Sequence, residues 1–220
     1  MGHIVQITTA IAISFEFVLA TSLLAIFASA YPDRFRTALW RDGGNKGWNS
    51  DPSYRTYLYA NYKEIPPMPL IWDERSTQYS LCVAIITMVL WFVRLCIRGR
   101  TLDVYGAAVS NVLYDIILMA LWSYSAVIQS SGDSSDPKHI SLRPWYLEHG
   151  CSEARSRNRA ACQAAKASFG LAIFAVLWFG FRCITTCMYG AYMYGKSSDD
   201  ADAVYFDNEK KCIQASLECS

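Results

Sequence analysis

The chain has 220 residues, of which 53% are hydrophobic and 18% are charged, and its formal net charge is +1. That charged fraction lies below the roughly 25% that is usual for soluble domains. A charge balance so close to zero, with no basic cluster carrying interleaved aromatic residues outside the apolar segments, argues against nucleic acid as a partner.

The apolar residues are gathered into four blocks, which cover residues 4–30, 77–97, 104–128 and 167–194. Each block is long enough to cross a hydrocarbon layer of about 30 Å. The sequence therefore predicts an all-α membrane protein in which residues 1–194 form a bundle of four transmembrane helices.

The first block contains Glu16 near its middle, and its N-terminus allows two interpretations. Ala28-Ser29-Ala30 has the small residues of a signal-peptidase site, so that residues 1–30 could be a cleaved signal peptide. The absence of Lys and Arg before the block and the presence of Glu16 inside it favour a retained helix. We expect the helix to be retained.

The loop that follows, residues 31–76, is long and rich in Tyr, Trp, Gly and Pro. Tyr54, Tyr57, Leu58 and Tyr62 recur within it at helical spacing. This pattern suits a short amphipathic helix on the membrane surface. It equally suits an aromatic-rich loop packed on the ends of the long helices.

The orientation of the bundle is indicated by basic residues and cysteines. Arg94, Arg98 and Arg100 crowd the short connection between the second and third blocks, which favours the cytosol for that connection. The two long loops contain more Lys and Arg, which by count alone favours the reverse.

Cysteines decide between the two orientations. Cys151 and Cys162 are the cysteines that fall in loops between the predicted spans, and both lie in the loop before the fourth block. A disulfide between them would require an oxidising compartment. We therefore expect a disulfide-closed second extracytosolic loop and cytosolic termini, in the plasma membrane or the secretory pathway; two free cysteines are the alternative.

Three apolar blocks contain one charged residue each: Glu16, Asp115 and Arg182. With four crossings, all three come to about the same depth, because each lies roughly 17–18 Å from the inner end of its block at 1.5 Å per residue. An isolated charge at a helix centre costs about 2.5–3.5 kcal/mol on insertion scales, so these residues need partners. We expect them to form an intramembrane charge network.

Arg182 has three possible roles. It could extend to the inner headgroups, pair with Glu16 or Asp115 inside the bundle, or belong to a transport or proton pathway. Cys183 and Cys187, on the same helix near the inner boundary, could be palmitoylated, although buried small cysteines are the commoner case.

The remaining sequence predicts no catalytic site. Its three histidines have no metal-binding spacing, and no phosphate-binding loop, nucleophile elbow or HExxH helix occurs. We therefore expect a protein that is not an enzyme and that binds no cofactor or metal. Residues 195–220 predict an acidic, disordered cytosolic tail.

The four spans, the cytosolic termini and the Cys151…Cys162 pair just before Ala165-Lys166-Ala167-Ser168-Phe169 resemble small MARVEL-like membrane proteins. The short N-terminal tail and the long first loop depart from that family. The resemblance implies membrane apposition, microdomain organisation or vesicle cargo sorting without catalysis.

Three functions follow as expectations. The first is a four-span organiser or accessory protein that contacts lipids and another integral membrane protein, or a second copy of itself. The second is an ion-conducting element that uses Glu16 and Asp115. The third is a small accessory subunit of a larger membrane enzyme or transporter complex.

Overall fold

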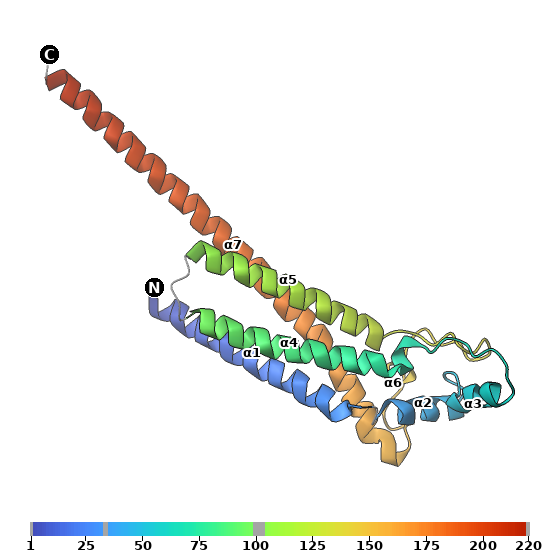
Figure 1. Cartoon of the computed structure of the whole chain (residues 1–220). Helices are drawn as coiled ribbons and strands as arrows, with labels where there is room; N and C mark the ends of the chain where they lie inside the picture. Colours follow the sequence, from blue (N-terminus) through green and yellow to red (C-terminus); the bar gives the residue numbers. More distant parts are fainter. Residues whose placement is uncertain (1, 33–34, 99–103, 219–220) are drawn as a thin grey trace.

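The computed structural model describes residues 2–32, 35–98 and 104–218. Four long helices pack lengthwise against one another and form the body of the molecule (Figure 1). In chain order they are α1 (Gly2–Ala30), α4 (Glu74–Arg98), α5 (Val104–Gln129) and α7 (Arg159–Glu218). In the part of the chain just given, β-structure is limited to one isolated antiparallel bridge between Asp133 and Ser141.

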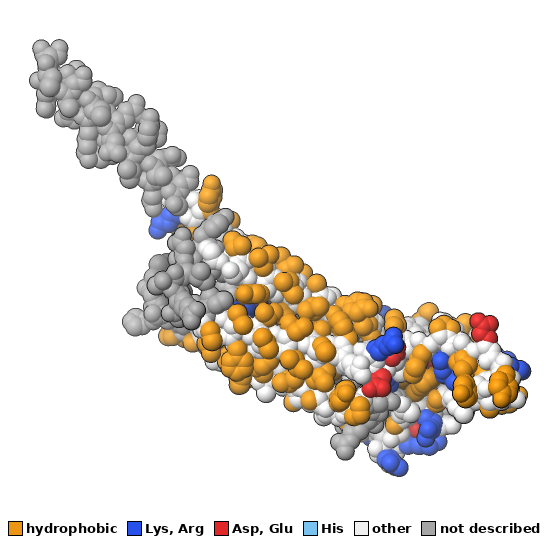
Figure 2. Space-filling view, in the orientation of Figure 1, with side chains coloured by type: hydrophobic (Ala, Val, Ile, Leu, Met, Phe, Trp, Pro, Cys, Tyr) orange, Lys and Arg blue, Asp and Glu red, His pale blue; other side chains and the backbone are white. Residues whose placement is uncertain are grey.

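Each long helix contains a segment that is long and apolar enough to cross a membrane. These segments are Thr9–Ala30, Glu74–Cys96, Ala108–Gln129 and Ser156–Lys196. Large apolar side chains cover the outside of the bundle, as Figure 2 shows for one face. The prediction of an all-α fold with four helices suited to a membrane is confirmed, which is consistent with an integral membrane protein.

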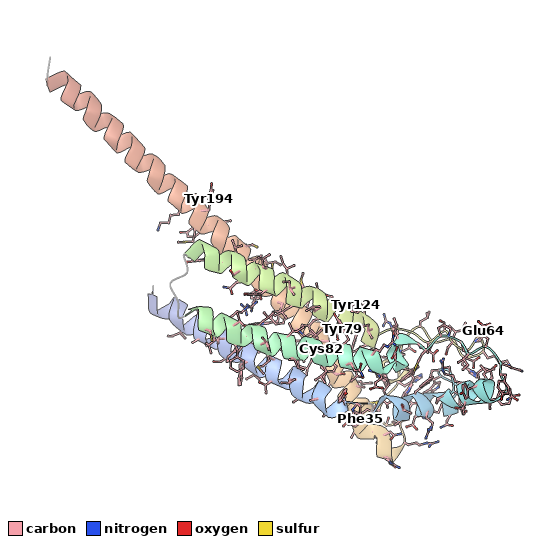
Figure 3. All side chains as sticks on the ribbon, in the orientation of Figure 1. Phe35, Glu64, Tyr79, Cys82, Tyr124 and Tyr194 are labelled. Carbon is pink, nitrogen blue, oxygen red and sulfur yellow. A yellow bond between two sulfur atoms is a disulfide. The ribbon has the colours of Figure 1, made fainter. Side chains whose placement is uncertain are left out.

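Residues from all four helices fill the interior of the bundle. The members that are at most 1% exposed include Leu23, Val83, Leu118, Trp122 and Phe179. Toward one end, Tyr79 of α4 meets Tyr124 of α5 edge-on with ring centroids 5.0 Å apart (Figure 3). The Tyr79 hydroxyl donates to the carbonyl of Leu121 at 3.2 Å, which ties α4 to α5.

The two long loops fold together into a cap at the end of the bundle opposite the N-terminus (Figure 1). Among the described residues, the cap has five short helices: α2 (Arg36–Asn45), α3 (Pro52–Ala60), η1 (Leu70–Trp72), α6 (Trp145–Glu148) and η2 (Ser156–Asn158). It has its own core, in which Trp40 and Trp72 stack with centroids 5.8 Å apart. The interpretation in which aromatic residues of the first loop pack on the ends of the long helices fits α2 and η1, which contribute Trp40 and Trp72 to this core.

Helix α3 occupies the segment for which an amphipathic helix is one of the two sequence interpretations. Asp51 caps it by accepting a hydrogen bond from the Ser53 amide at 2.8 Å, as N-cap residues do. Leu58 is buried, whereas the Tyr57 and Tyr59 side chains are 56% and 74% exposed. A surface location on a membrane stays a prediction for this helix.

Helix α7 continues far beyond the bundle, to Glu218 (Figure 1). The sequence predicts a disordered tail from residue 195 onward, whereas the structure extends the helix through residues 195–218. No Gly or Pro, the residues that most often end a helix, occurs between Gly195 and Glu218.

Candidate functional site

Four charged side chains meet inside the bundle, one from each long helix. The Arg94 guanidinium of α4 lies between two carboxylates: its Nη1 donates to Glu16 Oε1 at 2.7 Å and its Nη2 to Asp115 Oδ1 at 2.6 Å. Arg182 of α7 completes the group from the other side. Its Nη1 donates to Glu16 Oε2, and its Nε lies 3.7 Å from Asp115 Oδ2.

Each arginine thus contacts both acids, and the formal charges of the four residues cancel. We call Glu16, Arg94, Asp115 and Arg182 the charge cluster. Its acids are buried, with side chains 3% and 0% exposed, and its arginines nearly so, at 9% and 19%. Pairing is what makes such burial tolerable, because an unmatched charge in a medium of low dielectric constant is costly.

The structure brings together Glu16, Asp115 and Arg182, the three residues that the sequence singles out. Arg182 contacts both acids rather than extending to the headgroups. Sequence reasoning missed Arg94, because it assigned this residue to the charges of the short α4–α5 connection. A signal was available: Ser80, Thr87 and Arg94 follow one another at intervals of seven residues, and therefore lie on one face of α4.

The charge cluster lies near the middle of α1 and α5. Glu16 is 14 residues from each end of α1 (Gly2–Ala30), and Asp115 is 11 residues after the start of α5 at Val104 and 14 before its end at Gln129. At 1.5 Å per residue these are distances of about 17–21 Å from the helix ends. The shared level of Glu16, Asp115 and Arg182 is as expected, and Arg94 of α4 reaches the same level.

An apolar layer separates the charge cluster from the cap. Leu118 and Trp122 of α5 are fully buried, and Val83 of α4 is 1% exposed. Within this layer the Trp122 Nε1 donates to Thr87 Oγ1 at 3.0 Å, so its polar atom has a partner. These three apolar side chains therefore lie between the charge cluster and the cap.

Beyond this layer, short polar contacts join the helices near the cap. Ser80 and Ser125 share a hydrogen bond of 2.8 Å between α4 and α5. Ser168 of α7 donates to Gln129 Oε1 at 3.1 Å. Small hydroxylated residues allow close approach of helices within a membrane and hydrogen bonding across them.

Asp133 holds the two loops of the cap together. Its Oδ2 accepts from the amide and hydroxyl of Ser50, at 3.2 and 2.5 Å, and from Trp72 Nε1 at 3.1 Å. Its Oδ1 accepts from the amide and hydroxyl of Ser135, at 3.0 and 2.7 Å. Five donors therefore meet one carboxylate that is 1% exposed, which joins segments 61 and 83 residues apart in sequence.

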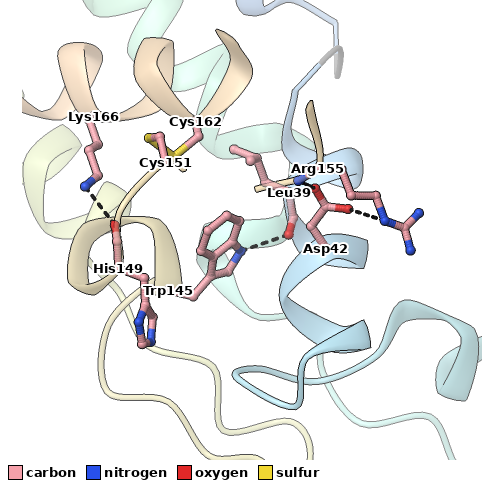
Figure 4. Close-up of a disulfide and its surroundings, with 8 residues drawn as sticks. All are labelled: Leu39, Asp42, Trp145, His149, Cys151, Arg155, Cys162 and Lys166. Carbon is pink, nitrogen blue, oxygen red and sulfur yellow. Dashed lines mark hydrogen bonds and ion pairs between the residues drawn. A yellow bond between two sulfur atoms is a disulfide. The ribbon is translucent and has the colours of Figure 1, made fainter. Parts of the chain in front are cut away.

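A disulfide between Cys151 and Cys162 closes the loop before α7, with Cα atoms 5.7 Å apart (Figure 4). Beside it, Trp145 Nε1 donates to the carbonyl of Leu39 at 2.9 Å. Asp42 accepts from Asn158 Nδ2 at 2.7 Å and pairs with Arg155 at 3.4 Å. The structure pairs the two cysteines as expected, and the disulfide ties the loop after α6 to the start of α7. The contacts of Trp145, Arg155 and Asn158 join the same region to α2.

The two cysteines that the sequence offers for palmitoylation lie on α7. Cys187 is exposed and Cys183 is half-buried on α7, so their palmitoylation stays a prediction. In the described part of the chain, no three His, Cys, Asp or Glu side chains gather as a metal site would require.

Comparison with known proteins gives one similarity. "Kojic acid related protein 1" of Aspergillus oryzae (strain ATCC 42149 / RIB 40) is 30% identical over 117 residues, which are 52% of this chain and 43% of that protein. The chain thus spans less than half of the length of the relative that it matches. No protein-family model matches the chain, and no solved structure matches it.

Proposed function

We propose that the protein is a non-enzymatic four-span membrane organiser or accessory protein, which acts through lateral contacts with lipids and other membrane proteins. One observation carries this proposal: the four charged side chains of the charge cluster pair with one another inside the bundle, while large apolar side chains point outward. Examples are Ile11 of α1, Leu113 of α5 and Leu177 of α7, which are 63%, 55% and 64% exposed. The apolar outer faces are then the surface through which the bundle acts.

The charge cluster supports a structural role rather than an ion path. Two arginines neutralise two acids, so the cluster has no net charge with which to attract a cation or an anion. The buried layer of Val83, Leu118 and Trp122 favours the same conclusion, because an ion would need polar partners across it. Glu16 and Asp115 therefore stabilise helix association in this proposal.

We place the cap outside the cytosol and both termini within it. The disulfide in the cap supports this orientation, since such bonds persist in oxidising compartments. Exposed positions at the two ends offer the test: Tyr59→Cys in the cap and Lys196→Cys on α7. In sealed cells a membrane-impermeant maleimide should label the first variant above the background of the unmodified chain, and the second only after permeabilisation. The reverse pattern would invert the orientation.

Membership of a MARVEL-like family belongs to the same proposal. Support comes from the number of suitable helices and from the disulfide at the start of the fourth. The functions implied are membrane apposition, microdomain organisation and cargo sorting. A role as a small subunit of a larger membrane enzyme or transporter remains the second candidate, favoured by the extensive outward apolar surface.

Purification of the full chain with its native lipids in a gentle detergent or copolymer tests the function. An accessory subunit should copurify with one large partner at a fixed ratio, and an organiser should give cross-links to itself or to several membrane proteins. A chain that is monomeric and free of cross-links would contradict both. Ion flux in proteoliposomes that Glu16→Gln abolishes would instead establish the conducting element.

A further inference from the structure

A groove of about 300 Å³ lies in the cap, between the segment that leads into α4 and the segment that leaves α5 (Figure 1). Residues 66–70 form one wall, which we call the proline wall. The other wall, the serine wall, is formed by Ser131, Gly132, Ser134 and Ser135. The volume of the groove is at the lower end of the range for sites that bind small molecules, about 300–1,000 Å³.

The proline wall is held against helix α3. Arg55 Nη1 donates to the carbonyl of Pro66 at 2.7 Å and to that of Pro67 at 3.3 Å. At the end of the wall, the carbonyl of Pro69 accepts from the Trp72 amide at 2.9 Å. The proline rings also fix the backbone angle φ at about −65°. This wall is therefore set in position before a ligand binds, which reduces the ordering that binding requires.

The serine wall is held from behind. Asp133 and Ser141 exchange two backbone hydrogen bonds, at 2.8 and 2.9 Å. The backbone of Gly132 passes so close to this bridge that a Cβ on it would lie 2.4 Å from the carbonyl oxygen of Ser141. The Asp133 side chain is buried behind this wall and is not part of the lining. Contacts with other segments thus position the serine wall as well.

The groove carries no formal charge. Among the described residues, those that line it include no Asp, Glu, Lys or Arg. An anionic ligand would find no cation there. A cationic ligand would find no free carboxylate, because Asp133 already accepts from Ser50, Trp72 and Ser135. Burial of an unmatched charge is costly, so the lining favours a neutral ligand.

Two of the serine hydroxyls in the groove are left as acceptors. Ser131 donates its hydroxyl hydrogen to the carbonyl of Ile128 at 2.8 Å, and Ser135 donates its own to Asp133 Oδ1 at 2.7 Å. Each serine oxygen still has lone pairs with which to accept. The prolines of the opposite wall have no backbone N–H to donate. A wholly apolar ligand would leave these acceptors unpaired, which is costly, so the lining favours a ligand that donates hydrogen bonds.

The proline wall adds apolar surface. Met68 and Leu70 are 41% and 55% exposed, and prolines precede and follow Met68 in the chain. A hexose matches this combination, since its ring has hydroxyl groups at its edge and C–H groups on its faces. The hydroxyls would donate to the serine wall while the C–H groups pack against the proline wall. Small-molecule sites commonly combine apolar surface with a few placed polar groups in this way.

We propose that this groove binds one neutral hexose unit, whose hydroxyl groups donate to the serine wall. A free saccharide and the headgroup of a glycolipid share this chemistry. The groove is placed to reach either, because Leu70 comes shortly before α4 and Ser131 shortly after α5, at the mouth of the bundle. The inference goes beyond the proposed function and requires no protein partner.

Saturation-transfer difference NMR tests the proposal on the full chain in phosphatidylcholine nanodiscs. The probes are the methyl glycosides of glucose, galactose and mannose, and empty nanodiscs are the blank. At least one of the three should receive saturation from the protein and bind with a Kd in the millimolar range or tighter. Methyl glucuronide and methyl glucosaminide, which carry charge, should bind more weakly than the neutral glycosides. Tighter binding of a charged sugar would show that the neutral assignment is wrong.

Substitutions at the serine wall separate the groove from nonspecific contact. Ser134 is exposed and lines the groove, so Ser134→Leu should fill it and weaken binding roughly tenfold or more. Ser131→Ala removes one acceptor and should weaken binding about fivefold, as expected for one hydrogen bond. Ser53→Leu, at an exposed serine of the cap outside the groove, is the matched control and should change nothing. Formation of the Cys151–Cys162 disulfide reports that each variant is folded.

Hexosylceramide in the nanodiscs distinguishes the two sources of the sugar. Binding of hexosylceramide more tightly than of the soluble glycoside assigns the sugar to a lipid headgroup, and an affinity no greater assigns it to a free saccharide; Ser134→Leu should lower the binding in both cases. Absence of saturation transfer to all three glycosides, or equal binding by wild type and Ser134→Leu, would overturn the inference. Neither result bears on the proposed function, which copurification and cross-linking test separately.

Discussion

Arg94 of α4 donates to Asp115 of α5 at 2.6 Å, and the same guanidinium reaches Glu16 of α1 at 2.7 Å. One side chain thereby connects three of the four long helices at a single level. The fourth helix joins through Arg182, which contacts both acids. Removal of one partner from such a buried group leaves an uncompensated charge, so the charge cluster favours the arrangement in which these four helix faces meet.

Trp122 tests whether the apolar layer stabilises the bundle. Trp122→Ala should lower the free energy of unfolding by about 3–5 kcal/mol, as large-to-small changes at buried aromatics do. Trp122→Phe should cost less, because it retains most of the packing and loses mainly the hydrogen bond to Thr87. Denaturant titration in detergent measures both. Val127→Ala, at a position of α5 that is 64% exposed, is the control, and an equal loss there would contradict the assignment.

Substitution of Asp133 tests whether this residue joins the two loops of the cap. Asp133→Ala leaves the buried donors of Ser50 and Trp72 without their acceptor, at about 1–3 kcal/mol for each buried group. Limited proteolysis should then cut both loops faster than in the wild-type chain. Asp51→Ala removes the cap of α3 and should expose α3 alone. If the two variants give the same cleavage pattern, Asp133 does not connect the loops.

Gly43 tests the fit of α2 against the cap. A Cβ at this position would lie 1.7 Å from Asn49 Oδ1 and 2.4 Å from Trp145 Cδ1. Gly43→Ala should therefore displace Trp145 and lower the thermal midpoint, followed by tryptophan fluorescence. Gly170→Ala is the matched control, because a Cβ at that position meets nothing within 4 Å. A neutral effect of Gly43→Ala would show that the cap is more loosely packed than described.

The turn at Asp136 and His139 predicts a local pH dependence. The hydrogen bond with His139 Nδ1, at 2.8 Å, is the main cause that lowers the pKa of Asp136, and the Lys138 amide adds to it. Because the folded pKa is lowered, the carboxylate stabilises this turn at a pH above its unfolded pKa, and that contribution disappears as the pH falls through the folded pKa. Hydrogen exchange of the turn amides should rise there. Asp136→Asn should remove the pH dependence, and an unchanged profile would refute the assignment.

The sequence predicts those parts of the structure that depend on local composition. Four apolar blocks specify four helices, and two loop cysteines specify their own pairing. The single charges of Glu16 and Asp115 point inward because lipid disfavours them. These inferences need only the length, polarity and spacing of nearby residues.

The missed features depend on contacts between distant segments. Nothing near Asp133 in sequence indicates that Ser50 and Trp72 are its partners, so the joining of the two loops was beyond prediction. Arg94 was overlooked for a different reason: it lies four residues from the end of α4 at Arg98, where an arginine ordinarily serves as an orientation signal. Its partners, not its position, reveal its role.

A double-mutant comparison at Arg94 and Asp115 tests the account most directly. Arg94→Ala leaves two acids facing one arginine, and should lower the stability of the bundle by about 3–5 kcal/mol together with its abundance in membranes. Arg94→Ala combined with Asp115→Asn restores neutrality and should recover a substantial part of that loss, while Lys196→Ala, at an exposed position of α7, should have no effect. A double variant no more stable than Arg94→Ala alone would contradict a self-neutralised charge cluster within the bundle.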